Sequence, residues 1–324
     1  MSAGYSDATR LVACIDIGSN TIKLLIARGG PGGSPEAVDE VTLPVRLGAG
    51  ISHEGYELAA EGMEQAVQAV QALADRARMR EAEPIIATAT SAVRDASNGT
   101  EFRDRIAAGA GLSVRVLDGD EEARYIARGV ASDPTLPATP RCTLVDIGGG
   151  SMELVRIVNR EPDVRISLPL GAVRLTERFV SDPTQPIGGS TLRAIAEEAR
   201  NVLGSCGFPW ARPAEPVVGT GGAVTWARVL LGHDRGLTTA GGANPRLPAD
   251  ELRDLLNTLA ALPQHEREAR FSLPPQRADI LPAALVVLTA CLEHTGAPAL
   301  HHSFYNLRFG VCAELLEHAA EIRR

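Results

Sequence analysis

The residues best suited to chemistry lie in one short stretch, VDIGGGSMELVRIV, at positions 145–158. Asp146 ends an apolar run there, and three glycines and Ser151 follow before the alternation of apolar residues resumes. A turn without bulky side chains exposes successive backbone N–H groups, which can form an anion-binding concavity for phosphate. An aspartate just before such a turn can hold a metal ion beside that phosphate, directly or through water. The stretch therefore predicts a phosphate-binding turn, although a plain hairpin with glycines at strained positions gives the same pattern.

A second copy of this pattern lies in the first half of the chain. The segments LVACIDIGSNTIKLLIA at 11–27 and CTLVDIGGGSMELVRIV at 142–158 both run from an apolar strand through Asp-Ile-Gly and a small polar turn into another strand. Asp16 and Asp146 are 130 residues apart. A later pair, PIIATATSAVRDA and PVVGTGGAVTWARVL, begins at Pro84 and Pro216 and keeps nearly the same offset. Two matches at one spacing indicate an internal duplication, which favours paired phosphate turns over two unrelated hairpins.

The elements that must position these turns follow from periodicity. Apolar residues three and four apart predict a helix over 58–80, and SVRVL at 113–117 predicts a strand that leads into a helix from Glu121 to about Val130. In the second half, helices are predicted for TLRAIAEEARNVL, ADELRDLLNTLAAL, a segment after Arg277 and GVCAELLEHAAEIRR. The predicted organisation is two mixed α/β domains, 1–130 and 131–324. The Pro-rich segment at 131–141 is read as their connector or as a tight hairpin, and the last helix, about 311–324, is a candidate to pack back on the first domain.

Composition excludes several classes of protein. The five cysteines are scattered and form no C-x-x-C pair, so neither a disulfide framework nor a thiolate metal site is indicated, and a reducing cytoplasm is expected. The first ten residues hold no apolar leader, and the longest apolar run stays below the ~18 residues that span a bilayer. A net charge of −8 argues against a nucleic-acid-coating surface. We therefore expect a soluble protein without a membrane or nucleic-acid partner.

Eight segments together resemble one family. They are IDIGSNTIKLLIA, ATATSAVRDASN, VLDGDEEARYIARGV, VDIGGGSMELV, LPLGAVRLTERF, GTGGAVTWA, PPQRADILPAA and SFYNLRFG. Their order and spacing resemble the exopolyphosphatase/guanosine pentaphosphate phosphohydrolase family of the actin-like ATPase superfamily, over essentially the whole chain. The DGDEEAR segment separates this family from the kinases and chaperones that share the two phosphate turns. The resemblance implies a duplicated actin-like (ribonuclease H-like) α/β fold of two domains, with the active site in a cleft between them.

The resemblance also implies roles for individual residues. Glu122 matches the carboxylate that orients or deprotonates the attacking water, with Glu121 as support; otherwise both are a solvated acidic first turn of a helix. Arg94 matches an arginine beside the bound phosphate, where its alternative is a surface charge next to Asp95. Asp146 is the third predicted catalytic residue. Predicted metal-binding residues are Asp146, Glu153 and Asp16, directly or through water, and predicted phosphate-binding residues are Gly18, Ser19, Asn20, Thr21, Ser91, Gly148, Gly149, Gly150, Ser151, Gly221 and Gly222.

Weaker predictions apply to two glycines, two histidines and three arginines. Gly221 and Gly222 approach substrate or serve only strand-to-helix packing. His301 and His302 either bind a polyanion when charged or, as the more common case, form an exposed loop pair, and no third ligand-spaced histidine or cysteine accompanies them. Three further arginines in family-like segments either line the cleft or pin helices by ion pairs; they are Arg174, Arg277 and Arg308.

The function predicted on this basis is hydrolysis. The chain is expected to release terminal phosphate from inorganic polyphosphate by metal-assisted attack of water on a phosphoanhydride, with Mg²⁺ as cofactor and Mn²⁺ as a substitute. One alternative is a guanosine pentaphosphate 5′-phosphohydrolase, because both substrates end in the same phosphoanhydride. Another is a weakly catalytic sensor that binds polyphosphate or (p)ppGpp. A cytoplasmic homodimer is expected in each case.

Overall fold

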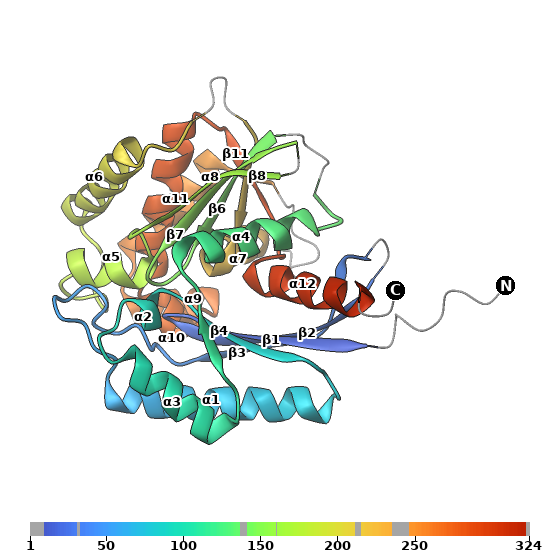
Figure 1. Ribbon diagram of the computed structural model, residues 1–324. Helices are drawn as coiled ribbons and strands as arrows, with labels where there is room; N and C mark the ends of the chain where they lie inside the picture. Colours follow the sequence, from blue (N-terminus) through green and yellow to red (C-terminus); the bar gives the residue numbers. More distant parts are fainter. Residues whose placement is uncertain are drawn as a thin grey trace. The chain divides into compact units, whose positions relative to one another are not determined.

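The computed structural model describes residues 10–30, 33–136, 141–159, 161–210, 215–234 and 246–321 (Figure 1). The chain forms two compact units, one of Met1–Thr135 with Tyr305–Arg324 and one of Leu136–Phe304. The predicted domain boundary was residue 130, and residues 137–140 of the predicted connector lie outside the described residues. The prediction placed 131–324 in the second domain with the last helix, about 311–324, as a candidate to pack back on the first, and Tyr305–Arg324 groups with the first unit.

The first unit contains a five-stranded sheet in the order β3-β2-β1-β4-β5. β1, β2 and β3 are antiparallel, whereas β1, β4 and β5 are parallel. The apolar runs of β1 and β2 are buried on both faces, as expected of central strands. The strands are β1 (Leu11–Ile17), β2 (Thr21–Gly29), β3 (Pro35–Pro44), β4 (Ile85–Ala89) and β5 (Val114–Val116).

The second unit repeats this topology. Its six-stranded sheet has the order β10-β11-β9-β6-β7-β8, so β8-β7-β6-β9-β11 corresponds to β3-β2-β1-β4-β5, with β10 added at one edge. The mixture of antiparallel and parallel pairs is also the same. The predicted duplication and the α/β fold class are therefore confirmed. The strands are β6 (Arg141–Ile147), β7 (Met152–Val158), β8 (Glu161–Leu168), β9 (Val217–Thr220), β10 (Arg246–Pro248) and β11 (Ala299–His302).

The helices predicted from periodicity are confirmed, with their ends shifted by a few residues. The structure also contains helices that were not predicted, and the helices of the first unit are α1 (Ala60–Met79), α2 (Ser91–Arg94), α3 (Gly99–Ala110), α4 (Gly119–Ala131) and α12 (Leu307–Glu321). Those of the second are α5 (Ala172–Phe179), α6 (Gly189–Ser205), α7 (Gly221–Asp234), α8 (Ala249–Ala261), α9 (Gln264–Phe271), α10 (Pro275–Ala278) and α11 (Leu281–Thr295).

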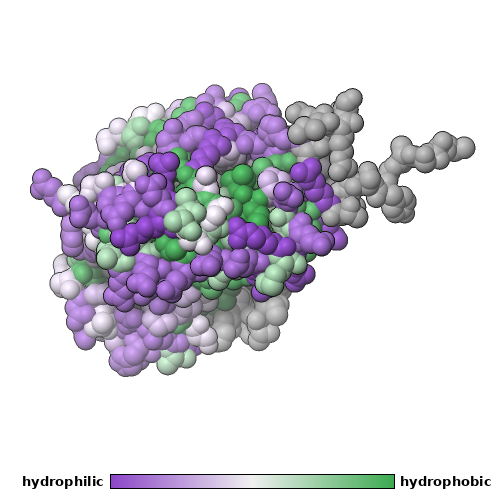
Figure 2. Space-filling view, turned by 60° about the horizontal axis from the view of Figure 1, so that its bottom comes forward, coloured by the Kyte–Doolittle hydropathy of each residue, from purple (hydrophilic) through white to green (hydrophobic). Residues whose placement is uncertain are grey.

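Helices cover both faces of the first sheet. In Figure 1, α1 and α3 lie on one side of β1–β4, and α4 and α12 lie on the other. α1 turns an apolar stripe that includes Met63, Val70 and Leu73 to the sheet, while its other side is polar. Figure 2 brings the α1 side of Figure 1 forward, and hydrophilic residues dominate this face, with apolar residues in smaller areas.

The most apolar helix lies in the core of the second unit. Within the described residues, the stretch Pro275–Thr295 has the length and hydropathy of a membrane span, but 89% of its most apolar window is buried. α11 packs against α6, α8, α7 and α5, which accounts for this burial. All five cysteines are free, and burial raises the pKa of Cys142 and Cys291 to about 12. These two thiols are therefore poor nucleophiles at neutral pH.

A buried arginine of α9 donates hydrogen bonds to three other segments of the second unit: α8, α10 and the loop at 183–185. Arg267 of α9 is fully buried and donates to the carbonyls of Leu259 (2.8 Å) and Ala278 (2.9 Å). It also donates to Gln185 (3.2 Å) and Pro183 (3.4 Å). Burial lowers the pKa of Arg267, and the negative charge of Asp279 only partly offsets this shift.

Replacing Arg267 by Met is expected to lower the free energy of unfolding by about 3 kcal/mol, because buried carbonyls lose their donors. Urea unfolding followed by circular dichroism measures this change. The control is Arg270→Met on the same helix, because Arg270 is exposed and stacks on Phe271. An Arg267→Met protein as stable as the control would show that these hydrogen bonds contribute little.

Candidate active site

The backbone carbonyls of the glycine turn of the second unit, residues 148–151, accept hydrogen bonds from neighbouring groups. Residues 148–151 connect β6 to β7, and the N–H of Gly148 donates to the carbonyl of Ser151 at 3.0 Å. The first amides of α5, at 172–174, donate to the carbonyls of Gly148 and Gly149 at 2.8–3.2 Å. Arg174 adds a bond from Nε to the carbonyl of Gly150 at 2.8 Å. Within the described part of the chain, the N–H groups of residues 149–151 donate to no protein acceptor. Unbonded amides in a turn of this kind are what an anion-binding concavity requires.

Gly171 permits this contact between α5 and the turn. A Cβ atom at Gly171 would lie 2.3 Å from the carbonyl carbon of Gly150 and 2.4 Å from the nitrogen of Ser151. Any other residue would push α5 away from the turn. The sequence offered a signal for Gly171 and Arg174 in the segment LPLGAVRLTERF, but their contact with the turn depends on tertiary structure.

Two carboxylates lie on neighbouring strands beside this turn. Asp146 of β6 pairs in register with Glu153 of β7, so both side chains lie on the same face of the sheet. Glu153 is 2% exposed, and its Oε1 accepts a hydrogen bond from Ser167 of β8 at 2.8 Å. Among the described residues, no group of three or more His, Cys, Asp or Glu side chains could hold a metal ion. Asp146 and Glu153 are thus two of the predicted metal-binding carboxylates, brought to one face of the sheet by strand register.

The turn from β9 into α7 approaches the same carboxylate. Gly221 has a φ of +85°, and a Cβ atom there would lie 2.0 Å from Oδ1 of Asp146. A Cβ atom at Gly222 would lie 2.7 Å from Nη1 of Arg277. These glycines thus allow both an aspartate and a guanidinium to lie against the start of α7, a closer relation than strand-to-helix packing requires.

The first unit contains the equivalent turn. The N–H of Gly18 donates to the carbonyl of Thr21 at 3.2 Å, and the carbonyls of Ser19 and Asn20 accept amides from residues 45–48 at 2.7–3.3 Å. The hydroxyl of Ser19 lies 3.1 Å from that of Ser91, at the start of α2. In both units, therefore, a neighbouring segment takes up the carbonyls of the turn.

The two units differ in the charge beside their aspartates. Asp16 of β1 pairs in register with Lys23 of β2, where Asp146 pairs with Glu153 in the second unit. The carboxylate oxygen Oδ1 of Asp16 is shielded from solvent and has no hydrogen-bond partner in the described chain. Burial raises the pKa of Asp16, although the charges of Lys23 and Arg308 oppose the shift. A lysine at this position makes the first unit the poorer of the two for binding a divalent cation.

Arg94 and Glu122, two of the predicted catalytic residues, contact each other. Nη1 of Arg94, at the end of α2, lies 3.0 Å from Oε2 of Glu122 in the first turn of α4. The same nitrogen donates to the carbonyl of Leu117 at 2.9 Å. Glu122 is 7% exposed and is not part of a solvated acidic face. The surface-charge alternative for Arg94 is not supported either, because its closest carboxylate is Glu122, with Asp95 at 3.6 Å.

Glu121 has a different environment. It forms a capping box with Asp118, in which the N–H of Glu121 donates to Oδ1 of Asp118 at 2.8 Å. Its carboxylate accepts the N–H of Asp118 at 3.1 Å and pairs with Arg115. Glu121 is thus a structural residue of the helix start.

The expectation of an exposed histidine pair is wrong for His302. His302 lies in β11 and is 1% exposed; its Nδ1 lies 3.3 Å from Nη1 of Arg228, and its Nε2 lies 3.2 Å from the hydroxyl of Thr225. That hydroxyl donates to the carbonyl of Gly221 at 2.8 Å. His302 therefore supports the glycine turn at Asp146. The short strand ALHH carries too few residues for periodicity to reveal it.

The predicted residues fall into two assembled sets. The first unit holds Asp16, Gly18, Ser19, Asn20, Thr21, Ser91, Arg94 and Glu122, and the second holds Asp146, Gly148, Gly149, Gly150, Ser151, Glu153, Gly221 and Gly222. Each unit thus contains a turn with an aspartate before it, and the pair of Arg94 and Glu122 lies in the first unit.

Known proteins resemble this chain over nearly its whole length. A sequence profile of the Ppx/GppA phosphatase family matches residues 25–319. The structure of a Ppx/GppA family member from Aquifex aeolicus is 27% identical, with a TM-score of 0.76, over 97% of this chain and 99% of that one. An exopolyphosphatase from Cytophaga hutchinsonii is 26% identical, with a TM-score of 0.83, over 95% and 98% of the two chains. An exopolyphosphatase-like protein at 24% identity, covering 96% and 99%, shares the fold with a TM-score of 0.87.

Proposed function

Because the chain belongs to the Ppx/GppA phosphatase family, we propose that it releases the terminal phosphate of inorganic polyphosphate. The family supports a phosphatase that acts on polyphosphate or (p)ppGpp, and the exopolyphosphatase of Cytophaga hutchinsonii supports the first substrate. The observation that carries the proposal is the buried contact between Glu122 and Arg94. A carboxylate and a guanidinium at this distance can serve the water and the phosphoryl group of one reaction.

In this proposal the reaction is a single displacement. Glu122 orients a water molecule and accepts its proton as the water oxygen attacks the terminal phosphorus. The bond from phosphorus to the bridging oxygen breaks, and the shortened polyphosphate leaves with the electron pair. Arg94 donates to the oxygens of the transferred phosphoryl group, whose charge is spread over them in the transition state.

The backbone of the glycine turn binds substrate oxygens. The N–H groups of residues 149–151 are available because they donate to no acceptor in the described chain, and the bonds from α5 to the carbonyls of the turn hold its backbone in place. Such amides are fixed before substrate arrives, so little reorganisation accompanies binding. They distinguish phosphate from other groups by charge and shape, and they do not read what lies beyond the terminal phosphates.

We further propose Mg²⁺, with Mn²⁺ as a substitute, as the cofactor. Asp146 and Glu153 fit a hard cation because both are carboxylates on one face of the sheet. Mg²⁺ commonly binds one or two carboxylates and keeps several waters, which agrees with a two-residue site, and Asp16 would act through water. A bound divalent cation supplies charge neutralisation at the phosphoryl oxygens.

Phosphate release from different substrates tests the proposal. The substrates are polyphosphates of several lengths, guanosine pentaphosphate and ATP, each with Mg²⁺, Mn²⁺ or a chelator. Faster turnover of polyphosphate would support the proposal, whereas faster turnover of guanosine pentaphosphate would replace it with the second family activity. Binding without turnover of any substrate would indicate a sensor.

Binding of polyphosphate is expected to weaken as monovalent salt rises, since each phosphate contact releases counterions. Replacing Arg94 by Gln removes one cationic contact and should reduce the slope of log Kd against log salt by about 0.7. Titrations at several salt concentrations measure the slope. The control is Arg105→Gln, because Arg105 is exposed on α3 and pairs with Glu101. Equal slopes in wild-type and Arg94→Gln proteins would show that Arg94 does not contact substrate.

A further inference from the structure

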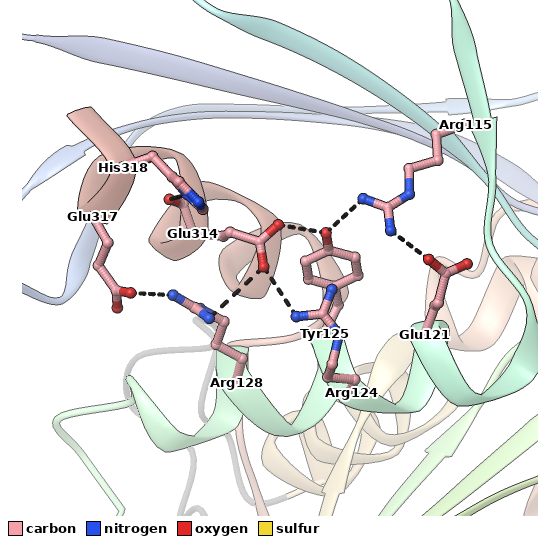
Figure 3. Close-up of polar contacts among 8 residues, drawn as sticks. All are labelled: Arg115, Glu121, Arg124, Tyr125, Arg128, Glu314, Glu317 and His318. Carbon is pink, nitrogen blue, oxygen red and sulfur yellow. Dashed lines mark hydrogen bonds and ion pairs between the residues drawn. The ribbon is translucent and has the colours of Figure 1, made fainter. Parts of the chain in front are cut away.

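A cluster of charged side chains joins α4 to α12 in the first unit (Figure 3). Its centre is Glu314 of α12, whose Oε1 accepts the hydroxyl of Tyr125 at 2.7 Å. Oε2 of Glu314 accepts Nη1 of Arg124 at 3.0 Å and lies 3.7 Å from Nη1 of Arg128. With four neighbouring residues, these side chains form a set of eight that we call the α4–α12 cluster: Arg115, Glu121, Arg124, Tyr125, Arg128, Glu314, Glu317 and His318.

The cluster extends from α12 to the strand that precedes α4. Nη1 of Arg115, in β5, donates to the hydroxyl of Tyr125 at 3.0 Å, and the same guanidinium pairs with Glu121. Tyr125 is 2% exposed, and the guanidinium of Arg124 lies over its ring at 4.2 Å. A continuous set of contacts therefore runs from Glu314 through Tyr125 to the first turn of α4, which also carries Glu122.

α12 provides a fixed support for this cluster. Arg308 near its start is 6% exposed and donates to the carbonyl of Leu24 in β2 at 2.8 Å and to Oε2 of Glu40 in β3 at 3.0 Å. The helices also touch through glycines: a Cβ atom at Gly310 would lie 1.9 Å from the carbonyl oxygen of Tyr125, and one at Gly129 would lie 2.0 Å from that of Asn306. The position of α4 is thus set against the sheet by α12.

Charge makes Glu314 the central member of the cluster. Burial opposes its ionisation, but hydrogen bonds from Tyr125 and Arg124 and the charges of Arg124 and Arg128 prevail and lower the pKa of Glu314. Arg124 and Arg128 are one helical turn apart, so without the carboxylate two like charges would face each other. Glu317 is peripheral by comparison, since its side chain is 63% exposed and its ion pair within the described residues is with Arg128.

We infer that Glu314 is a positioning residue for hydrolysis, which acts through Tyr125 to hold α4 where Glu122 meets Arg94. The inference rests on the proposed role of Glu122. It gives the C-terminal helix a part in the reaction, although α12 contains none of the predicted catalytic residues. Glu314 reaches α4 at Tyr125, and Tyr125 follows Glu122 by about one helical turn.

The test compares Glu314→Gln with Glu317→Gln, the same chemical change one turn further along α12. Glu314→Gln is expected to lower kcat about tenfold with little change in KM, because displacing a reacting group penalises the transition state. Glu317→Gln should retain wild-type kcat. Tyr125→Phe, which removes only the hydroxyl, should lower kcat in the same direction and guards against a Glu314→Gln protein that fails to fold.

A double variant separates positioning from general damage. If Glu314 acts through Glu122, Glu314→Gln should cause no further loss of kcat in a Glu122→Gln background. Hydrogen exchange of the amides at 119–131 should be faster in Glu314→Gln than in Glu317→Gln. Equal kcat in the two single variants, or a full tenfold loss in the Glu122→Gln background, would overturn the inference. If wild-type protein releases no phosphate from any substrate, the proposed function fails, and unchanged exchange on α4 would then overturn the inference separately.

Discussion

Replacing Glu122 by Gln is expected to lower kcat for phosphate release by about 10²-fold or more, because the amide cannot accept the proton of the attacking water. The amide keeps the shape of the side chain and can still accept a hydrogen bond from Arg94 through its oxygen, which lies at 3.0 Å in the wild type. Polyphosphate binding should therefore persist. Steady-state assays of phosphate release and a binding titration of the same protein measure the two quantities.

Glu121→Gln is the matched control. Glu121 adjoins Glu122 but serves the capping box with Asp118 and the contact with Arg115. Its replacement should lower the free energy of unfolding by about 0.5–1 kcal/mol and leave kcat close to the wild-type value. A large loss of kcat in Glu121→Gln with none in Glu122→Gln would transfer the catalytic role to Glu121.

The sequence predicted the parts of the site that repeat. Asp16 and Asp146 were found because each ends a strand before a small-residue turn, and the strand order of both sheets confirms that the two halves correspond. Comparison of the halves did not predict their electrostatic difference, although Lys23 and Glu153 are both visible in the sequence. Their significance depends on strand register, which places each beside an aspartate.

Contacts between distant segments could not be predicted. The support that His302 gives to Gly221 crosses about 80 residues, and the contact of Glu314 with Tyr125 crosses 189. Each depends on which helix or strand lies beside another, whereas periodicity reports only which face of an element is apolar. Gly129 and Gly310 illustrate the limit, because each appears unremarkable in its helix until the close approach of α4 and α12 is known.

The second large effect is expected at Gly221. Replacing it by Ala should lower kcat/KM for phosphate release by about 10²-fold, the usual consequence of moving a catalytic group by about 1 Å. The added Cβ would lie 2.0 Å from Oδ1 of Asp146, a separation that no stable contact permits, so either the carboxylate or the turn must move. The turn is itself held, because its carbonyl accepts the hydroxyl of Thr225 at 2.8 Å. Displacement of Asp146 is therefore the expected response.

The strain of the backbone must be separated from this displacement. Gly221 has a φ of +85°, so Ala there also costs roughly 1 kcal/mol of conformational energy. Gly207→Ala is the control, since Gly207 has a φ of +73° and a Cβ there would meet no atom within 4 Å. Thermal melts should show a loss of stability in both proteins, whereas only Gly221→Ala should lose activity. Wild-type kcat/KM in Gly221→Ala would show that activity does not depend on the contact between Gly221 and the carboxylate of Asp146. An equal loss of kcat/KM in Gly207→Ala would show the same, because that variant leaves Asp146 in place.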